Sequence, residues 1–261
     1  MSSQLADIQS QADSREVSLS QVGVKGLEYP IRVLDKVKKI QYTTAKVDLF
    51  ADLPQHFKGT HMSRFVEIFH SYREDLSMPR FLEMLTQIRE DLEAESAFGS
   101  MCFPYFVEKK APVSQLPGII SCQCRYRGRV SKEPGTKNFT VAVSVPVNTV
   151  CPCSRAISDR GAHNQRGIVT VELELGPFFW IEDIIALVES SASSPVYSLV
   201  KREDEKYITE RAYDNPVFVE DLVRDVYVKV RDMDQFPRFS VEAENFESIH
   251  NHSAYAFAEH R

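Results

Sequence analysis

The sequence has no run that approaches the roughly 18 consecutive apolar residues of a membrane-spanning helix, so it predicts no membrane span. It also has no excess of basic residues. The formal net charge of −6 argues against broad electrostatic binding to nucleic acid, although a local basic pocket for a small anion stays open. The first residues, MSSQLADIQSQADSREVS, lack a basic segment followed by an apolar core, so we expect no secretory signal there.

Cysteine is scarce and odd in number, with five residues: Cys102, Cys122, Cys124, Cys151 and Cys153. An odd count without a secretory signal is typical of the reducing cytoplasm, where structural disulfides are rare. We therefore expect a cytoplasmic protein whose cysteines pack in the core, bind a metal or take part in chemistry. For Cys122 and Cys124, which lie among aromatic and basic residues of an expected strand, packing is the favoured interpretation.

The overall composition, 43% hydrophobic and 26% charged over 261 residues, is ordinary for a globular protein, so the pattern along the chain must indicate the fold. Apolar–polar alternation predicts strands over residues 31–52, 100–113, 118–131, 138–150, 167–175 and 238–249. Apolar residues at helical spacing predict two helices joined near 77–79, one over 180–193, and one that starts at Asn215 and Pro216. We expect residues 1–25 to be a poorly ordered tail and HNHSAYAFAEHR to be a short polar end piece.

The order of these elements is strands, two helices and strands, followed by a similar second series. This order predicts an α+β protein with two tandem halves, at about 26–135 and 136–261. Each half would carry a pair of helices on one face of an antiparallel sheet.

The segment PVNTVCPCSRAISDRGAHNQRG, residues 146–167, holds Cys151, Cys153 and His163 at the end of an expected strand. Thiolate and imidazole are the usual zinc ligands, and three protein ligands plus water make an open, catalytic site. The C-x-C spacing matches no common zinc finger, and cysteines two apart rarely meet disulfide geometry. From spacing alone, two interpretations are about equally favoured. One is an open metal site, and the other is a loop without a chemical role that has two half-buried cysteines and a surface histidine.

Two further groups of polar residues could carry chemistry. In ENFESIHNHSA, the pair His250 and His252 lies beside Glu247, and two imidazoles near a carboxylate suit proton transfer at neutral pH. A polar surface segment is the alternative. The mixed-charge run VKREDEKYITERAYDNPVFVED, residues 200–221, is for most of its residues typical of a solvated face, but Glu220 within it borders an apolar helical stripe.

These segments, with GTHMSRF and LVKREDEKYITERAYDNPVFVEDLVRD, resemble GTP cyclohydrolase type IB, the prokaryotic enzyme that opens the guanine ring to start folate synthesis. The resemblance runs from about residue 59 to residue 256 and leaves the first 25 or so residues outside. It implies a tunnelling fold, in which antiparallel sheets carrying helix pairs assemble into a barrel-like homo-oligomer, a tetramer, with active sites at subunit interfaces.

The resemblance also implies a divalent metal, zinc or manganese, held by Cys151, His163 and Glu205. Cysteine and histidine ligands favour zinc, whereas a carboxylate ligand is also compatible with manganese. Cys153 would lie close to the metal as a further ligand or as a catalytic thiol.

For the substrate, the resemblance implies that Glu220 pairs with the N1–H and the exocyclic amine of guanine, which adenine cannot offer. Glu247, His250 and His252 would handle protons. The candidates for binding the triphosphate are Arg64, Arg160, Arg166, Lys201 and Arg202.

The implied reaction converts GTP and water to 7,8-dihydroneopterin triphosphate and formate. An archaeal-type cyclohydrolase that gives a cyclic phosphate product is one alternative. The NADPH-dependent nitrile reduction of queuosine synthesis is another, against which the Cys-Pro-Cys segment and the paired histidines speak. A third is a non-catalytic metal or redox module built on Cys151 and Cys153, which would not turn over GTP.

Overall fold

The structure, a computed structural model, describes residue 9 and residues 13–133, 137–174 and 176–261. The elements in chain order are β1 (Leu19–Asp35), β2 (Lys39–Leu53), α1 (Met62–Tyr72), α2 (Met78–Asp91), β3 (Ser96–Lys110), β4 (Pro117–Ser131), β5 (Lys137–Val150), α3 (Pro152–Ile157), β6 (Asn164–Glu174), α4 (Ile181–Glu189), β7 (Ser194–Pro195), α5 (Arg202–Asp214), α6 (Val219–Asp232), β8 (Phe239–Asn245) and β9 (Ala254–His260).

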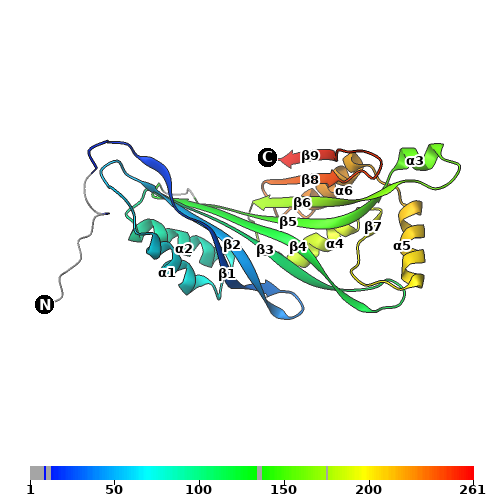
Figure 1. The fold of residues 1–261 in the computed structure, drawn as a ribbon, viewed down its shortest axis with the longest axis horizontal. Helices are drawn as coiled ribbons and strands as arrows, with labels where there is room; N and C mark the ends of the chain where they lie inside the picture. Colours follow the sequence, from blue (N-terminus) through cyan, green and yellow to red (C-terminus); the bar gives the residue numbers. More distant parts are fainter. Residues whose placement is uncertain (1–8, 10–12, 134–136, 175) are drawn as a thin grey trace. The chain divides into compact units, whose positions relative to one another are not determined.

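The described strands form one nine-stranded sheet (Figure 1). Its order is β1-β2-β3-β4-β5-β6-β8-β9, and the short β7 pairs with β5. The pairings β1–β2, β2–β3, β5–β7, β6–β8 and β8–β9 are antiparallel. The α+β class and the antiparallel sheet are therefore confirmed.

The chain forms two compact units, one of residues 1–103 and 125–140, the other of residues 104–124 and 141–261. The strands β3, β4 and β5 each contribute to both units. The division therefore differs from the single cut near residue 135 that element order predicted, because strands of 14 or 15 residues are long enough to serve two cores.

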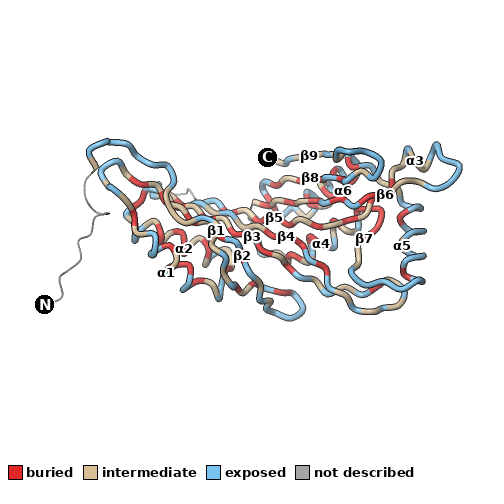
Figure 2. Tube along the Cα trace, in the orientation of Figure 1, coloured by how far each residue is buried: buried red, intermediate tan, exposed pale blue. Residues whose placement is uncertain are grey.

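In the first unit, α1 and α2 cover one face of the sheet (Figure 1). Helix α1 ends at Tyr72 and α2 begins at Met78, close to the predicted junction. A Cβ added at Gly99 or Gly128 would meet the Leu85 side chain at 2.9 Å. Glycine at these two strand positions therefore lets α2 lie close against the sheet. Buried and exposed residues alternate along the strands beneath, as expected for a sheet with one covered face (Figure 2).

The first strand begins within residues 1–25, which the sequence predicted to be a poorly ordered tail. Strand β1 begins at Leu19, which pairs with Leu53, and Val22 pairs with Ala51. The tail prediction was wrong for residues 19–25, because an edge strand keeps exposed polar residues while its backbone bonds to a partner. Residues 1–8 and 10–12 lie outside the described residues.

In the second unit, α4 and α6 bury their apolar stripes, and α6 packs against β8 and β9. The hydroxyl of Tyr105 on β3 donates a hydrogen bond of 2.7 Å to Glu182 on α4. Cys122 and Cys124 on β4 are buried, which confirms the packing interpretation. Burial raises the pKa of Cys122 to about 12 and raises that of Cys124 as well, so both thiols stay protonated.

All five cysteines, each within the described residues, are free thiols. None of the helices in the described part of the chain is long and apolar enough to cross a membrane.

Three elements of the second unit differ from the sequence prediction. Helix α5 occupies the mixed-charge run, and only Asp204 and Ala212 are buried on it. Helix α6 begins at Val219 with Phe218 as its N-cap, not at Asn215 and Pro216. The expected polar end piece contains strand β9, which pairs with β8 along its whole length.

Asp204 shows what holds α5 in place. Its carboxylate accepts hydrogen bonds from the amides of Val113 at 2.8 Å, Ser114 at 2.9 Å and Lys201 at 2.9 Å. The Ser114 hydroxyl donates another, at 2.6 Å. The side chain is fully buried, so the prediction of a solvated face was wrong for Asp204. One carboxylate therefore caps α5 and fixes the loop between β3 and β4.

The stability that Asp204 supplies should depend on pH. Although burial opposes ionisation, the hydrogen bonds from Ser114, Lys201 and Val113 hold the pKa of Asp204 well below its usual range. A carboxyl with a lowered folded-state pKa stabilises the fold above its unfolded pKa of about 4 and loses that contribution as the pH falls. We expect Asp204→Asn to lower the thermal midpoint by several degrees at pH 7.

Thermal unfolding at pH 7, 5 and 3 measures this effect. The difference between the wild type and Asp204→Asn should be full at pH 7 and 5 and smaller at pH 3. Asp221→Asn, at an exposed acidic position on α6, is the matched control. A difference that grows towards pH 3 would contradict the assignment.

Candidate active site

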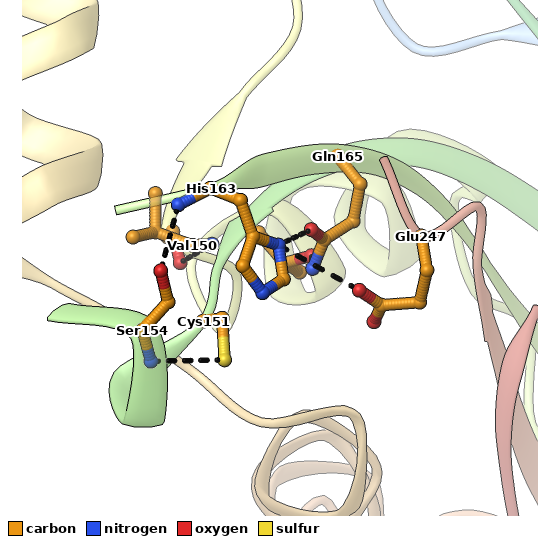
Figure 3. Close-up of polar contacts among 8 residues, drawn as sticks. Val150, Cys151, Ser154, His163, Gln165 and Glu247 are labelled. Carbon is orange, nitrogen blue, oxygen red and sulfur yellow. Dashed lines mark hydrogen bonds and ion pairs between the residues drawn. The ribbon is translucent and has the colours of Figure 1, made fainter. Parts of the chain in front are cut away.

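The segment that joins β5 to β6 brings Cys151 and His163 together. Cys151 follows the last residue of β5 and is the N-cap of the short helix α3, while His163 directly precedes β6. The Cys151 amide donates a hydrogen bond of 3.1 Å to the His163 carbonyl oxygen, which closes the loop at its base. Both candidate ligands therefore lie where β5 ends and β6 begins, and Figure 3 shows them side by side.

Ser154 connects the two residues a second time. Its amide donates to Cys151 Sγ at 3.4 Å, and its hydroxyl accepts from the His163 amide at 3.0 Å. Cys151 is half-buried, whereas Cys153 is exposed on α3. The loop therefore holds the Cys151 sulfur in place and leaves Cys153 open to solvent.

The His163 ring has two oxygen atoms facing one of its nitrogens. Nδ1 lies 3.0 Å from Gln165 Oε1 and 3.7 Å from Glu247 Oε2. Figure 3 shows Nε2 turned away from both oxygens, on the side of the ring where Cys151 lies. The side chains of His163 and Glu247 are only 16% and 14% exposed, so the contact is largely shielded from water.

The end of β8 places Glu247 across from His163. The Phe246 amide donates a hydrogen bond of 2.9 Å to the Arg166 carbonyl oxygen, next to the last paired residues of β6 and β8. A Cβ at Gly167 would overlap the Asn245 side chain, so the glycine of the motif lets β8 approach here. The close approach explains why a glycine follows Arg166.

A backbone hydrogen bond also connects the segment before α6 to the end of β5, next to Cys151. The Val217 amide donates a hydrogen bond of 3.1 Å to the Val150 carbonyl oxygen, directly before Cys151. Glu220 lies in the first turn of α6 and is exposed. The structure thus links the helix that carries Glu220 to the loop that carries Cys151 and His163.

Other predicted residues are not gathered at the loop in the same way. Glu205 is exposed on α5, and the described residues contain no group of three or more His, Cys, Asp and Glu side chains arranged to hold a metal ion. His250 and His252 stack on each other with ring centres 5.0 Å apart, in the exposed segment between β8 and β9.

The basic candidates are all exposed. Arg64 belongs to the first unit, where its Nη1 donates a hydrogen bond of 2.7 Å to the Asp91 carbonyl oxygen. The others lie in the second unit: Arg160, Arg166, Lys201 and Arg202.

The sequence prediction missed Ser154, Gln165 and Thr149 around His163. Gln165 Nε2 donates to Thr149 Oγ1 at 3.0 Å, and both side chains are buried. A usable signal was present for Gln165, since it occupies an inward position in the alternation of β6, where apolar residues otherwise stand.

Comparison with solved structures defines the class first. The uricase from Arthrobacter globiformis matches with a TM-score of 0.50 over 92% of both chains at 6% sequence identity. At that identity the likeness shows the fold alone, which is the tunnelling fold.

Comparison of sequences then gives the family. The model of the family described as type I GTP cyclohydrolase folE2 matches residues 5–256. GTP cyclohydrolase FolE2 from Syntrophotalea carbinolica is 51% identical over 255 residues, covering 98% of this chain and 95% of that protein. FolE2 from Syntrophus aciditrophicus is also 51% identical, covering 98% of this chain and 99% of that protein. The chain belongs to the type I GTP cyclohydrolase FolE2 family.

The family confirms the resemblance that the sequence motifs indicated. The match begins at residue 5, so it also covers most of the N-terminal residues that the resemblance left outside.

Proposed function

We propose that the protein is a metal-dependent GTP cyclohydrolase I that converts GTP and water to 7,8-dihydroneopterin triphosphate and formate, the first step of folate biosynthesis. Family membership supports the substrate and the reaction class. The observation that carries the proposal is the closed loop in which Cys151 and His163 meet, with oxygen atoms facing Nδ1 of the histidine.

The donors in the loop fit a divalent metal. The Cys151 sulfur and the His163 Nε2 are the ligand types that zinc prefers, and a carboxylate from Glu205 keeps manganese open. Such a metal would supply Lewis-acid activation of water and of the purine when bound. We assign Cys151, His163 and Glu205 as its ligands and Cys153 as a neighbouring thiol that binds or takes part in the chemistry.

The roles in substrate binding and proton transfer fall on residues of α6 and of the segment between β8 and β9. Glu220 accepts the N1–H and the exocyclic amine of guanine, a pairing that fixes the base and rejects adenine. Glu247, His250 and His252 supply and remove protons during ring opening and the later rearrangement. The partial burial of Glu247 beside His163 supports its place in the site.

The triphosphate requires cationic partners, and exposed arginine and lysine side chains suit it. We assign this role to Arg64, Arg160, Arg166, Lys201 and Arg202, which are all exposed.

The active enzyme is proposed to be a cytoplasmic homotetramer with active sites at subunit interfaces. Glu205 is exposed rather than gathered with Cys151 and His163, as expected if a second subunit completes the site. The terminal strand β9 also exposes Tyr255 by 59% and Phe257 by 52%, an apolar edge suited to burial in an assembly. A monomeric mass by light scattering would contradict the tetramer, and recovery of the protein outside the cytoplasmic fraction would contradict the location.

The test is turnover of GTP by protein reconstituted with zinc or with manganese. We expect release of formate and a pterin that fluoresces after oxidation. Mass analysis of the product separates the linear triphosphate from a cyclic phosphate. Metal binding or thiol oxidation without formate, with either metal, would instead support a non-catalytic module.

A further inference from the structure

Gln165 makes contacts on both sides of its amide. Its Oε1 lies 3.0 Å from His163 Nδ1, and its Nε2 donates to the Thr149 hydroxyl at 3.0 Å (Figure 3). The side chain is only 6% exposed, and Thr149 is fully buried. A buried amide held at both ends has little freedom to turn, so it presents a fixed atom to the histidine.

The atom that it presents sets which ring nitrogen carries the proton. Neutral histidine has one N–H and one bare nitrogen, and the bare nitrogen is the one that binds a metal. An oxygen 3.0 Å from Nδ1 requires the proton on Nδ1, which leaves Nε2 bare.

Glu247 gives a second, independent reason for the same tautomer. Its Oε2 lies 3.7 Å from the same Nδ1, and a carboxylate oxygen only accepts hydrogen bonds. A reversed Gln165 amide would place an N–H against Nδ1 and would leave Glu247 facing a bare nitrogen. Gln165 and Glu247 are therefore both compatible with the same histidine tautomer only when the oxygen of the Gln165 amide faces Nδ1.

We infer that Gln165 is a positioning residue that holds His163 with its proton on Nδ1 and Nε2 directed to the metal. The inference rests on the proposed function, because it takes His163 as a metal ligand. Gln165 itself acts through His163 and touches neither the metal nor the substrate. Partners of this kind on ligating histidines typically contribute about 10- to 100-fold in metal affinity.

The experiment compares Gln165→Met with Gln165→Glu in the full-length protein. Methionine has a similar volume but no strong acceptor, whereas glutamate restores an oxygen towards Nδ1. Metal-free protein is titrated with Co²⁺, whose sulfur-to-metal absorption reports coordination by Cys151. We expect Gln165→Met to bind Co²⁺ about 10- to 100-fold more weakly and Gln165→Glu to stay within about threefold of the wild type.

Ser144→Ala is the matched control. Ser144 on β5 bonds through its hydroxyl to Thr170 on β6 at 2.9 Å, so this variant removes a side-chain bond between the same two strands outside the loop. Its Co²⁺ affinity should equal that of the wild type. Nitrogen NMR of the metal-free protein gives a direct second readout, with Nδ1–H expected for His163 in the wild type and a mixture of tautomers in Gln165→Met.

Two results would overturn the inference while leaving the metal site intact. One is unchanged Co²⁺ affinity in Gln165→Met. The other is equal weakening in Gln165→Met and Gln165→Glu, which would indicate packing. If instead Cys151→Ala and His163→Ala bind Co²⁺ as tightly as the wild type, the proposed metal site is itself wrong.

Discussion

Replacing His163 or Cys151 with alanine is expected to remove the bound metal and to abolish formate release from GTP. Each variant deletes one of the two donors that the loop holds together through the Cys151 amide and the His163 carbonyl oxygen. Loss of one ligand from an open site should weaken metal binding by more than about 100-fold, beyond the effect of losing a supporting neighbour. Metal content after dialysis and formate release from GTP measure the two effects.

The fold should survive both changes, since each side chain is at least partly exposed and neither fills the core. His56→Ala provides the matched histidine control, because His56 lies in the first unit and its ring packs at a tilt against Phe57. It should keep both metal and activity. An alanine variant at position 163 or 151 that retains full metal content would show that the metal is held elsewhere.

Replacing Glu220 with alanine is expected to weaken GTP binding and to leave the metal content unchanged. The carboxylate is proposed to make two charge-assisted hydrogen bonds to guanine, and their loss should raise the KM for GTP by about 100-fold or more. Steady-state kinetics with GTP, and metal analysis of the same sample, test both parts.

Asp221→Ala is the control for Glu220→Ala. Both acidic residues lie in the first turn of α6, where a negative charge favours the helix to a similar extent. Asp221 is engaged with Arg224 at 2.7 Å on the helix surface and should leave the KM unchanged. Loss of metal in Glu220→Ala, or an equal rise in KM in both variants, would contradict the assignment of Glu220 to the base.

Periodicity predicted the parts of the fold whose side chains face a core. The helices α1 and α2, with Phe65 and Phe81 buried, and strand β6, with Val169 buried, follow this rule. Helix α5 could not be found in this way, because it has no apolar stripe and is fixed by Asp204 bonding to residues some 90 positions earlier in the chain. Strand β9 was missed because its side chains are intermediate or exposed throughout.

For the candidate site, the sequence predicted the residues with reactive side chains but not their hydrogen-bonding neighbours. Thiol, imidazole and carboxylate chemistry, with the family resemblance, pointed to Cys151, His163 and Glu220. The positions of Gln165 and Ser154 were not predictable, because their contacts depend on how the loop folds back onto the strand. Their side chains are ordinary polar ones, and only the geometry distinguishes them.

The hydrogen bond from the Cys151 amide to the His163 carbonyl oxygen also has a consequence for the entropy cost of binding a metal at the proposed site. Bringing two ligands together across a flexible segment costs loop-closure entropy, and in small zinc domains the metal must supply it. Here the folded backbone has already closed the ring that the metal would otherwise close. If Cys151 and His163 bind the metal as proposed, metal binding and folding would be separate processes, and the metal could exchange without unfolding of the chain.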